Sequence, residues 1–183
     1  MTGERPSDDV TGLPAALSEL PWSAEFVMQA IEILPVALAG RTIEYWRPIH
    51  ADSFVVGWPA GARPEEIARA TVEQLGLDPV VLHSTSWRHG GGEVVLTYLA
   101  VVTVRTPPEE WLAVPVARAE LARGDATAPP PVIGIEQVVE HGLRHLAWLL
   151  REDPAVQQGA GAWRELLAGY EPEPFRAFGP PVA

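Results

Sequence analysis

The segment from Pro64 to Leu77 carries acidic side chains of the type that bind a metal ion, in the outline of a catalytic helix. Its sequence, PEEIARATVEQLGL, contains Glu65, Glu66 and Glu73 together with Arg69. Mg²⁺ prefers hard oxygen ligands, and residues three or four apart on a helix lie on one side, so they can converge on one ion. A magnesium ion held in this way neutralises phosphoryl oxygens and positions a hydroxide for cleavage of a diphosphate. The segment therefore indicates magnesium-dependent phosphate chemistry as one function to test.

Residues 69–77, Arg-Ala-Thr-Val-Glu-Gln-Leu-Gly-Leu, resemble the helix motif of the Nudix superfamily. The signature of that superfamily is Gly-x5-Glu-x7-Arg-Glu-U-x-Glu-Glu-x-Gly-U, where U is apolar. The positions of Arg69, Glu73, Gly76 and Leu77 match it. The resemblance implies a Nudix-like sandwich with a core at about 42–152, and a magnesium-dependent pyrophosphohydrolase as the usual activity of that fold.

The catalytic part of the motif departs from the family pattern. Two of the three helix acids are replaced, by Ala70 and Gln74, and the upstream glutamate position falls on Gly61. Alanine supplies no ligand, and the amide of glutamine offers only a neutral oxygen. Glu66 stands seven residues before Glu73, about 10 Å along the helix axis, so joint chelation of one ion would be strained.

An ordinary amphipathic helix explains the same residues without a metal. Pro64 suits the first helical turn, and Gly76 suits a helix end. Glu65, Arg69 and Glu73 would then form an exposed ladder of i,i+4 pairs, each contributing a few tenths of a kcal/mol.

Three functions follow from these observations. The preferred hypothesis is a Nudix-like domain that has lost pyrophosphohydrolase activity and acts as a ligand-binding or protein-interaction module, without enzymatic activity or a cofactor. The alternative is an active Mg-dependent hydrolase of nucleoside diphosphate derivatives. That hydrolase would use the non-standard catalytic residues Glu73, Arg69, Glu65 and Glu66, with an acid from another strand such as Glu93.

The third hypothesis is a metal-binding protein built on His141 and His145. These residues are four apart in a predicted helix, the spacing at which two imidazoles bind one metal ion. The remaining ligand would be His83, His89, His50 or a carboxylate. A pair of half-buried histidines that only donate hydrogen bonds explains the same spacing.

Aromatic and polar residues at predicted strand ends form a candidate ligand-binding set. The chain has seven tryptophans, and aromatic planes in loops can stack against a flat ligand. The stretch HSTSWRHGGG adds histidine and arginine beside a glycine turn. The candidate ligand-binding residues are Trp46, Trp58, His83, Trp87 and Arg88. Packing in the core, with hydroxyls alternating along an edge strand, is the competing interpretation.

The elements that would position these residues are strands and helices in mixed order. We expect an α/β or α+β fold with a mixed β-sheet flanked by helices, and an added N-terminal helical segment. Strands are predicted at 41–49, 53–58, 79–89 and 92–104, with the glycines at 90–92 forming a hairpin, and a short strand or helix within 111–124. Helices are predicted from residue 13 to about 33, with a longer part from Ser23, and at 64–76, 133–152 and 162–168.

The helix predicted at 133–152 has one apolar stripe. Its members recur at helical spacing and are Ile135, Val138, Val139, Gly142, Leu146, Leu149 and Leu150. Glu136, Glu140 and Arg144 are expected to face away from the core.

Length and composition favour one soluble globular unit. We expect a flexible tail at 1–12, a single globular domain at 13–170 and a Pro-rich tail at 171–183. All 13 basic residues are arginine, against 24 acids, and the net charge of −11 argues against nucleic acid as a partner. The sequence has no cysteine and no apolar run long enough to span a membrane.

The expected setting is therefore the cytoplasm, because the N-terminal residues do not resemble a secretion signal. The expected partner is an unidentified small molecule or protein, and a homodimer is among the states that the sequence leaves open.

Overall fold

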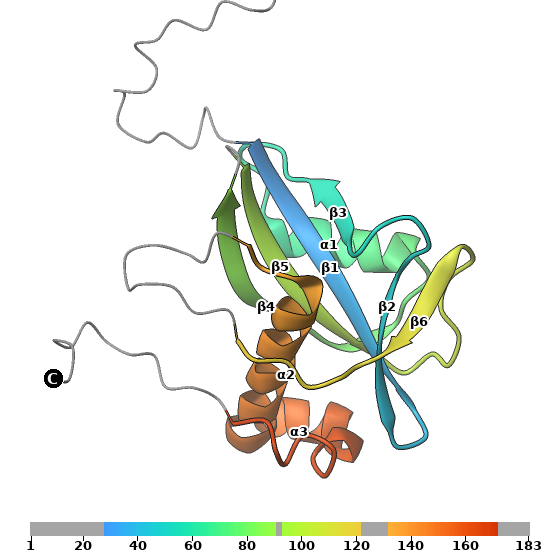
Figure 1. Ribbon diagram of the computed structural model, residues 1–183. Helices are drawn as coiled ribbons and strands as arrows, with labels where there is room; N and C mark the ends of the chain where they lie inside the picture. The colour runs from blue at the N-terminus through green and yellow to red at the C-terminus, as the bar shows by residue number, and fades with distance from the viewer. Residues whose placement is uncertain (1–27, 91–92, 122–131, 172–183) are drawn as a thin grey trace, which may run out of the picture.

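A mixed β-sheet of six strands forms the centre of the computed structural model, which describes residues 28–90, 93–121 and 132–171 (Figure 1). The strands are β1 (Met28–Ala39), β2 (Thr42–Pro48), β3 (Phe54–Gly57), β4 (Pro79–Gly90), β5 (Glu93–Val102) and β6 (Trp111–Pro115). The helices are α1 (Pro64–Gln74), α2 (Ile135–Glu152) and α3 (Pro154–Ala160), followed by the 3₁₀ turn η3 (Gly161–Trp163). The predicted mixed sheet flanked by helices is confirmed.

Strand β1 is the central strand of this sheet. The order is β4-β5-β1-β2-β6, and β3 pairs with β1 beside that path. On one side β1 runs parallel to β5, and on the other it pairs antiparallel first with β3 and then with β2. Pro35 stands between the stretch paired with β3 and the stretch paired with β2. The strands at 42–58 and the β4–β5 hairpin thus share one sheet, with β1 between them.

The helix predicted up to residue 33 is wrong where the structure describes it, because residues 28–39 form β1. The run from Ala30 to Ala39 is apolar except for Glu32, and its interior side chains are buried. A strand covered on both faces needs such a continuous apolar run, which short-range spacing does not distinguish from a buried helix. The earlier part of the predicted helix, and the predicted tail at 1–12, lie outside the described residues.

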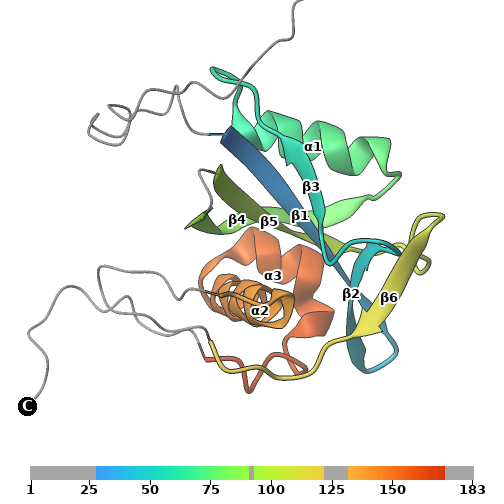
Figure 2. The ribbon, with the colours of Figure 1, turned by 45° about the horizontal axis from the view of Figure 1, so that its top comes forward.

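The helices cover the two faces of the sheet unequally. In Figure 2, α1 lies on one side of the sheet and α2 and α3 lie on the other. One core cluster joins Ala68 and Val72 of α1 to Ile31 and Ile33 of β1. The other cluster is larger and joins α2, α3 and the segment 161–170 to the opposite face of the same strands. The sheet therefore separates an α1 face from an α2 face.

Helix α2 approaches the sheet closely at Gly142. A Cβ at this position would lie 3.2 Å from Cδ1 of Leu99, which is closer than ordinary van der Waals contact. The small residue thus sets the distance between α2 and β5. The helices predicted at 64–76 and 133–152 are confirmed, with Gly76 adopting the positive φ of 66° that ends α1.

The C-terminal elements begin earlier than predicted. The last helix was expected at 162–168, whereas α3 spans Pro154–Ala160 and is followed by η3 and a series of turns. The carboxylate of Asp153 accepts hydrogen bonds from the N–H groups of Ala155 and Val156, so it caps the start of α3. The segment after α3 still packs on the core through Trp163, Leu167 and Tyr170.

Helix length also bears on membrane insertion. Within residues 28–90, 93–121 and 132–171, none of the helices has the length and apolar character that a membrane span requires.

Candidate functional site

The outer face of α1 holds the residues that match the Nudix motif. Arg69 and Glu73 are exposed, and so are Ala70 and Gln74, the positions at which acids are replaced. The buried face of the helix consists instead of Ala68, Thr71 and Val72. Arg69 and Glu73 therefore point into solvent, whereas Leu77 of the motif is buried after the end of α1. Glu73 stands without a second carboxylate beside it in the positions of Ala70 and Gln74.

The first-turn acids of α1 are paired with an arginine that precedes the helix. Arg63 forms an ion pair with Glu65, and its Nη1 lies 3.2 Å from Oε1 of Glu66. The hydrogen bond of the Glu65 backbone N–H and the Arg63 side chain lower the pKa of Glu65 below its ordinary value. The ladder predicted between Glu65, Arg69 and Glu73 does not occur in the described part of the chain, because the contacts go to Arg63.

The additional acid suggested for a hydrolase site lies on the other side of the sheet. Side chains along β5 alternate between the two faces of the sheet. Leu96 and Tyr98 pack toward the α1 core, so Glu93 lies on the opposite face together with Val95 and Thr97. Thr97 contacts Glu32 on the α2 face. Glu93 is therefore separated from Glu73 by the sheet.

The predicted ligand-binding residues do not meet in one place. Trp46 and Trp58 belong to the α1 face, and Trp87 is the register partner of Leu96 on the same face. His83 is the register partner of Leu99, and Arg88 contacts Glu32, so both belong to the α2 face. The alternation of side chains along a strand explains this division, because Trp87 and Arg88 are neighbours in sequence and must point to opposite faces.

The three tryptophans of that set also differ in exposure. Trp46 is only 1% exposed, so it lies in the core, and its role in ligand binding stays a prediction. Its Nε1 is buried and has no hydrogen-bond partner among the described residues. Trp58 donates from Nε1 to the carbonyl of Ala62 at 2.8 Å and so fixes the loop before α1. Trp87, at 70% exposed, is the one member of the trio that a ligand or partner can reach over a large area.

A buried ionic cluster lies on the α2 face of the sheet. The carboxylate of Glu32 accepts hydrogen bonds from Arg88 Nη1 at 2.7 Å and Nη2 at 2.8 Å, a bidentate pair. Its two oxygens also accept hydrogen bonds from the hydroxyl groups of Ser53 at 2.6 Å and Thr97 at 2.8 Å. Glu32 is 1% exposed, whereas the Arg88 side chain is 30% exposed. Three strands and one loop are joined at this carboxylate.

The protonation state of Glu32 follows from these contacts. Burial raises its pKa, but hydrogen bonds from Arg88 and Ser53, the charge of Arg88 and the hydrogen bond from Thr97 together lower it below the ordinary value. The carboxylate is therefore held ionised with four donors on its two oxygens. A general acid or base needs a proton that it can exchange near neutral pH, so this cluster is suited to structure rather than proton transfer.

A second buried carboxylate, Glu140, contradicts the prediction for the polar face of α2. Glu140 is 0% exposed and accepts hydrogen bonds from Arg118 Nε and Nη2, at 3.1 and 3.0 Å, and from Arg144 Nε at 2.9 Å. The guanidinium of Arg118 also lies 4.0 Å from the ring centroid of Tyr170. The segment after β6 thus covers this side of the helix, which periodicity within α2 could not reveal.

Three histidines gather between α2 and β4. The ring centroids of His141 and His145 are 4.8 Å apart, and those of His83 and His145 are 6.2 Å apart. His141 donates from Nε2 to the carbonyl of Thr85 at 3.2 Å, whereas Nδ1 of His145 is buried and finds no partner in the part of the chain that the structure describes. Burial, together with the charges of His141 and His83, lowers the pKa of His145 to about 4. His145 is thus neutral at pH 7.

The metal centre hypothesised at His141 and His145 has no complete set of ligands among the described residues. Across the described residues, no group of three or more His, Cys, Asp or Glu side chains is arranged to hold a metal ion. His50 is exposed in the turn after β2. The side chain of His89 is outside what the structure describes.

Comparisons with known proteins concern the fold. No protein-family model matches the chain, and no curated protein matches it. Among solved structures, a MutT/Nudix family protein from Enterococcus faecalis is 12% identical, with a TM-score of 0.47, over 78% of this chain and 70% of that chain. NrtR from Shewanella oneidensis is 13% identical, with a TM-score of 0.48, over 79% and 78% of the two chains.

A third structure is the NUDIX domain of Shewanella oneidensis NrtR complexed with ADP ribose. It is 12% identical, with a TM-score of 0.43, over 73% of this chain and 99% of that chain. All three belong to the superfamily that residues 69–77 resemble. At these identities and TM-scores, the likeness carries no information about the ligand or the activity of this chain.

Sequence reasoning missed the two buried glutamates. Glu32 is the one charged residue in the apolar run of β1, and that isolation is a signal that it has a buried partner. Its partner Arg88 lies 56 residues later, and no local pattern connects the two. Glu140 gave no such signal, because it stands among other polar residues of α2.

Proposed function

We propose that this chain is a Nudix-like domain that acts as a ligand-binding or protein-interaction module and does not hydrolyse diphosphates. The observation that carries the proposal is the outer face of α1, where Ala70 and Gln74 occupy positions of metal-binding acids. Glu73 is exposed there without a neighbouring carboxylate at those positions.

The chemistry of diphosphate cleavage explains why this face is insufficient. Magnesium is bound through carboxylates that offset its charge and leave positions for phosphate oxygens and water. Glu65 and Glu66 both contact Arg63, whose positive charge opposes the binding of a cation. One carboxylate without a second anionic ligand offers weak, unselective attraction to a solvated Mg²⁺.

The proposal is tested by assaying turnover and binding on the same protein. The purified chain would be incubated with nucleoside diphosphate derivatives, ADP-ribose among them, in Mg²⁺ or Mn²⁺, and phosphate or nucleotide release would be measured. Glu73→Gln is the test variant. Glu93→Gln is the matched control, because it makes the same change on the opposite face of the sheet.

We expect no metal-dependent turnover by the wild type or by either variant, and calorimetry with the same compounds then reports binding separately from hydrolysis. Turnover that is lost in Glu73→Gln but kept in Glu93→Gln would overturn the proposal and establish the hydrolase.

A further inference from the structure

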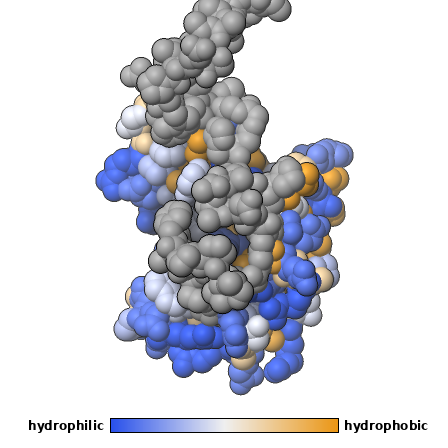
Figure 3. All heavy atoms as spheres, turned by 60° about the vertical axis from the view of Figure 1, so that its left-hand side comes forward, coloured by the Kyte–Doolittle hydropathy of each residue, from blue (hydrophilic) through white to orange (hydrophobic). Residues whose placement is uncertain are grey.

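Strand β4 is the long edge of the sheet. It has twelve residues, whereas β6 at the other end of the strand order has five. Figure 1 shows β4 at the left-hand side of the sheet, and its partner among the described strands is β5. Figure 3 turns this side toward the viewer, with apolar residues in its upper and middle parts and a mainly hydrophilic lower end, where α3 lies in Figure 1. The outer edge of such a strand presents N–H and C=O groups to which another extended chain can add, unless it is covered or interrupted.

The first half of β4 is closed in this way. Helix α3 lies against its start, where a Cβ added at Gly159 would be 3.6 Å from the carbonyl oxygen of Val80. A bulge at 84–86 interrupts the ladder with β5, and the carbonyl of Thr85 accepts a hydrogen bond from His141 of α2. An added strand therefore finds no continuous edge along this half.

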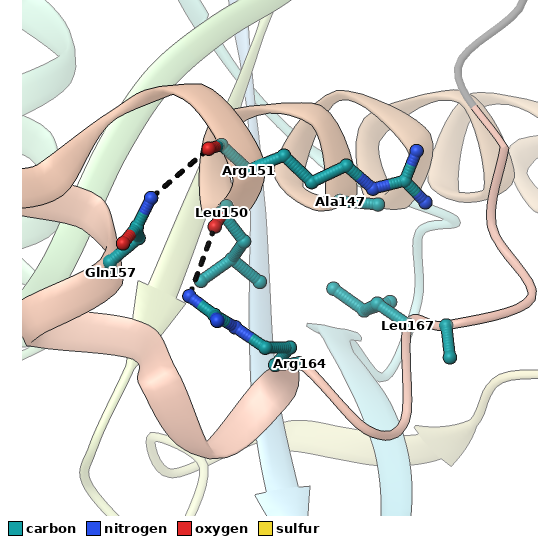
Figure 4. Close-up of a pocket in the computed structure, with 7 residues that line it drawn as sticks. Ala147, Leu150, Arg151, Gln157, Arg164 and Leu167 are labelled. Atoms are coloured by element: carbon teal, nitrogen blue, oxygen red, sulfur yellow. Dashed lines mark hydrogen bonds between the residues drawn. The ribbon is translucent and has the colours of Figure 1, made fainter.

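Hydrogen bonds hold α3 in this position. Gln157 of α3 donates to the carbonyl of Arg151 at 3.1 Å, and Arg164 donates from Nη2 to the carbonyl of Leu150 at 3.3 Å (Figure 4). Both carbonyls belong to the last turn of α2, so α3 and the segment after it are fixed to that helix. The first half of β4 is thus covered by an element that is itself held in place.

The second half of β4, at 86–90, lacks these protections in the part of the chain that the structure describes. Its backbone pairs with β5, and no other backbone or side chain among the described residues bonds to its outer edge. Trp87 lies in this half and is 70% exposed. A side chain on an added strand would stand about 5 Å from the residue opposite it, which is contact distance for an aromatic ring. The open edge and the ring of Trp87 therefore form one surface suited to an extended peptide.

The charges around this half favour a basic partner. Arg88 is the arginine of β4, and the carboxylate of Glu32 already matches its charge through the bidentate pair. Glu93 is the register partner of Gly90 at the open end, and the whole chain carries a net charge of −11. A negative field attracts basic segments, and the face of an exposed tryptophan ring binds a guanidinium or ammonium group.

A second copy of the chain is a poorer occupant of this edge. Two copies would each bring a net charge of −11 to the contact, so they would repel one another. Pairing of 86–90 with the same residues of another copy would also bury well below the ~1,200 Å² that stable interfaces need. The short open edge suits a short extended segment instead.

We propose that residues 86–90 of β4 bind an extended basic segment of a partner protein as an added strand, with an arginine or lysine side chain against the ring of Trp87. The inference rests on the interaction part of the proposed function and names its surface and its partner class. It uses no residue of α1, so peptide binding and diphosphate turnover can succeed or fail separately.

The test measures binding of three fluorescent peptides to the full chain by anisotropy. The first is a short peptide that alternates valine with arginine, and the second has glutamate in place of each arginine. The third is the basic peptide with methylated backbone nitrogens, which cannot donate hydrogen bonds to a strand. Trp87→Gln is the test variant. Trp148→Gln is the matched control, because it removes a tryptophan that is 45% exposed on α2.

The wild type and Trp148→Gln are expected to bind the basic peptide and neither of the other two. Trp87→Gln is expected to bind the basic peptide roughly fivefold more weakly, since it loses the ring that the cation contacts. Amide exchange at 86–90 is expected to slow in the complex, because strand pairing protects N–H groups. Circular dichroism checks that both variants fold, and the methylated peptide and the amide exchange decide the question if Trp87→Gln does not.

Equal binding of the basic peptide by the two variants, or no binding of it by the wild type, would overturn the inference. Equally tight binding of the acidic peptide would also overturn it, because the charge argument would then be wrong. Sedimentation of the wild type as a dimer that Trp87→Gln abolishes would assign the edge to a second copy instead.

Discussion

The acids of α1 and the acids buried beside the sheet have opposite environments. On α1, Glu66 and Glu73 are exposed, and Glu66 forms an ion pair with Arg63 at the surface. Glu32 and Glu140 are almost completely buried, and each accepts hydrogen bonds from at least one arginine and one further donor. Removing a partner from a buried pair costs far more than breaking a surface pair.

The residues that resemble a catalytic motif are therefore different from the residues that stabilise the fold. The motif on α1 draws attention because its spacing resembles a catalytic signature, yet its acids make the weaker contacts. The glutamates that hold strands and helices together lie outside any motif. The predictions below test this contrast, beginning with the largest expected effect.

Glu32→Gln is expected to destabilise the fold most. The substitution removes the negative charge but leaves Arg88 beside Thr97 in a partly buried position, and breaking such a pair costs about 3 kcal/mol or more. Urea unfolding followed by circular dichroism measures this free energy. Glu73→Gln, the same change at an exposed site, is the control and is expected to unfold with the wild type. Equal stability of the two variants would contradict the assigned roles.

Glu140→Gln is expected to have a smaller but clear effect of about 2 kcal/mol. Its partner Arg118 is 51% exposed, so water can solvate that guanidinium once the carboxylate is lost. The second partner, Arg144, is only 16% exposed, but it keeps its hydrogen bond to the carbonyl of Glu171. A separate variant, Arg118→Ala, removes the hydrogen bonds to Glu140 and also the contact with the Tyr170 ring. The same urea experiment distinguishes the variants, and a loss larger than that of Glu32→Gln would reverse the expected order.

Acidification is expected to weaken the fold before the glutamates titrate. The pKa of His145 is lowered from 6.5 to about 4, so the unfolded chain binds its proton more tightly than the folded chain. Its contribution is therefore complete above about pH 6.5 and is lost progressively toward pH 4, with a slope of at most about 1.4 kcal/mol per pH unit. Burial lowers the pKa of His83 and outweighs the charge of Asp153, which raises it. Acidification therefore weakens the fold through His83 in the same direction as through His145.

The measurement is the urea midpoint at pH 7, 5.5 and 4.5. His145→Gln is expected to flatten the decline between pH 6.5 and 4.5, whereas the glutamates, with lowered pKa values, add their losses only below about pH 4.5. An unchanged slope in the variant would show that His145 is not the responsible group.

Arg63→Gln is expected to have the smallest effect. Its contacts with Glu65 and Glu66 are exposed, where water and salt screen the charges. The urea midpoint should stay within experimental error of the wild type at 0.15 M salt. A large destabilisation would mean that this surface pair organises the start of α1.

The sequence predicted most of the sheet and both long helices, because these elements carry strong local signals. Gly76 ends α1 with a positive φ, and the β4–β5 hairpin follows from its glycines. The central strand β1 was predicted as helix, because a strand buried on both faces lacks the alternation that identifies exposed strands. That error concerned the strand around which the sheet is ordered.

The candidate site was predictable only in part. The losses at Ala70 and Gln74 are visible in the sequence, and so is the pair His141 and His145. The burial of Trp46 and Glu140 was not, since each is covered by elements distant in the chain.

The central claim is that the outer face of α1 no longer forms a metal site. The most direct measurement is a Mn²⁺ titration of the isotope-labelled protein, in which bound Mn²⁺ broadens the amide signals of nearby residues. We expect no saturable broadening centred on Arg69–Gln74, and the same result for Glu73→Gln. Saturable broadening there that disappears in Glu73→Gln would contradict the account and restore α1 as a metal-binding helix.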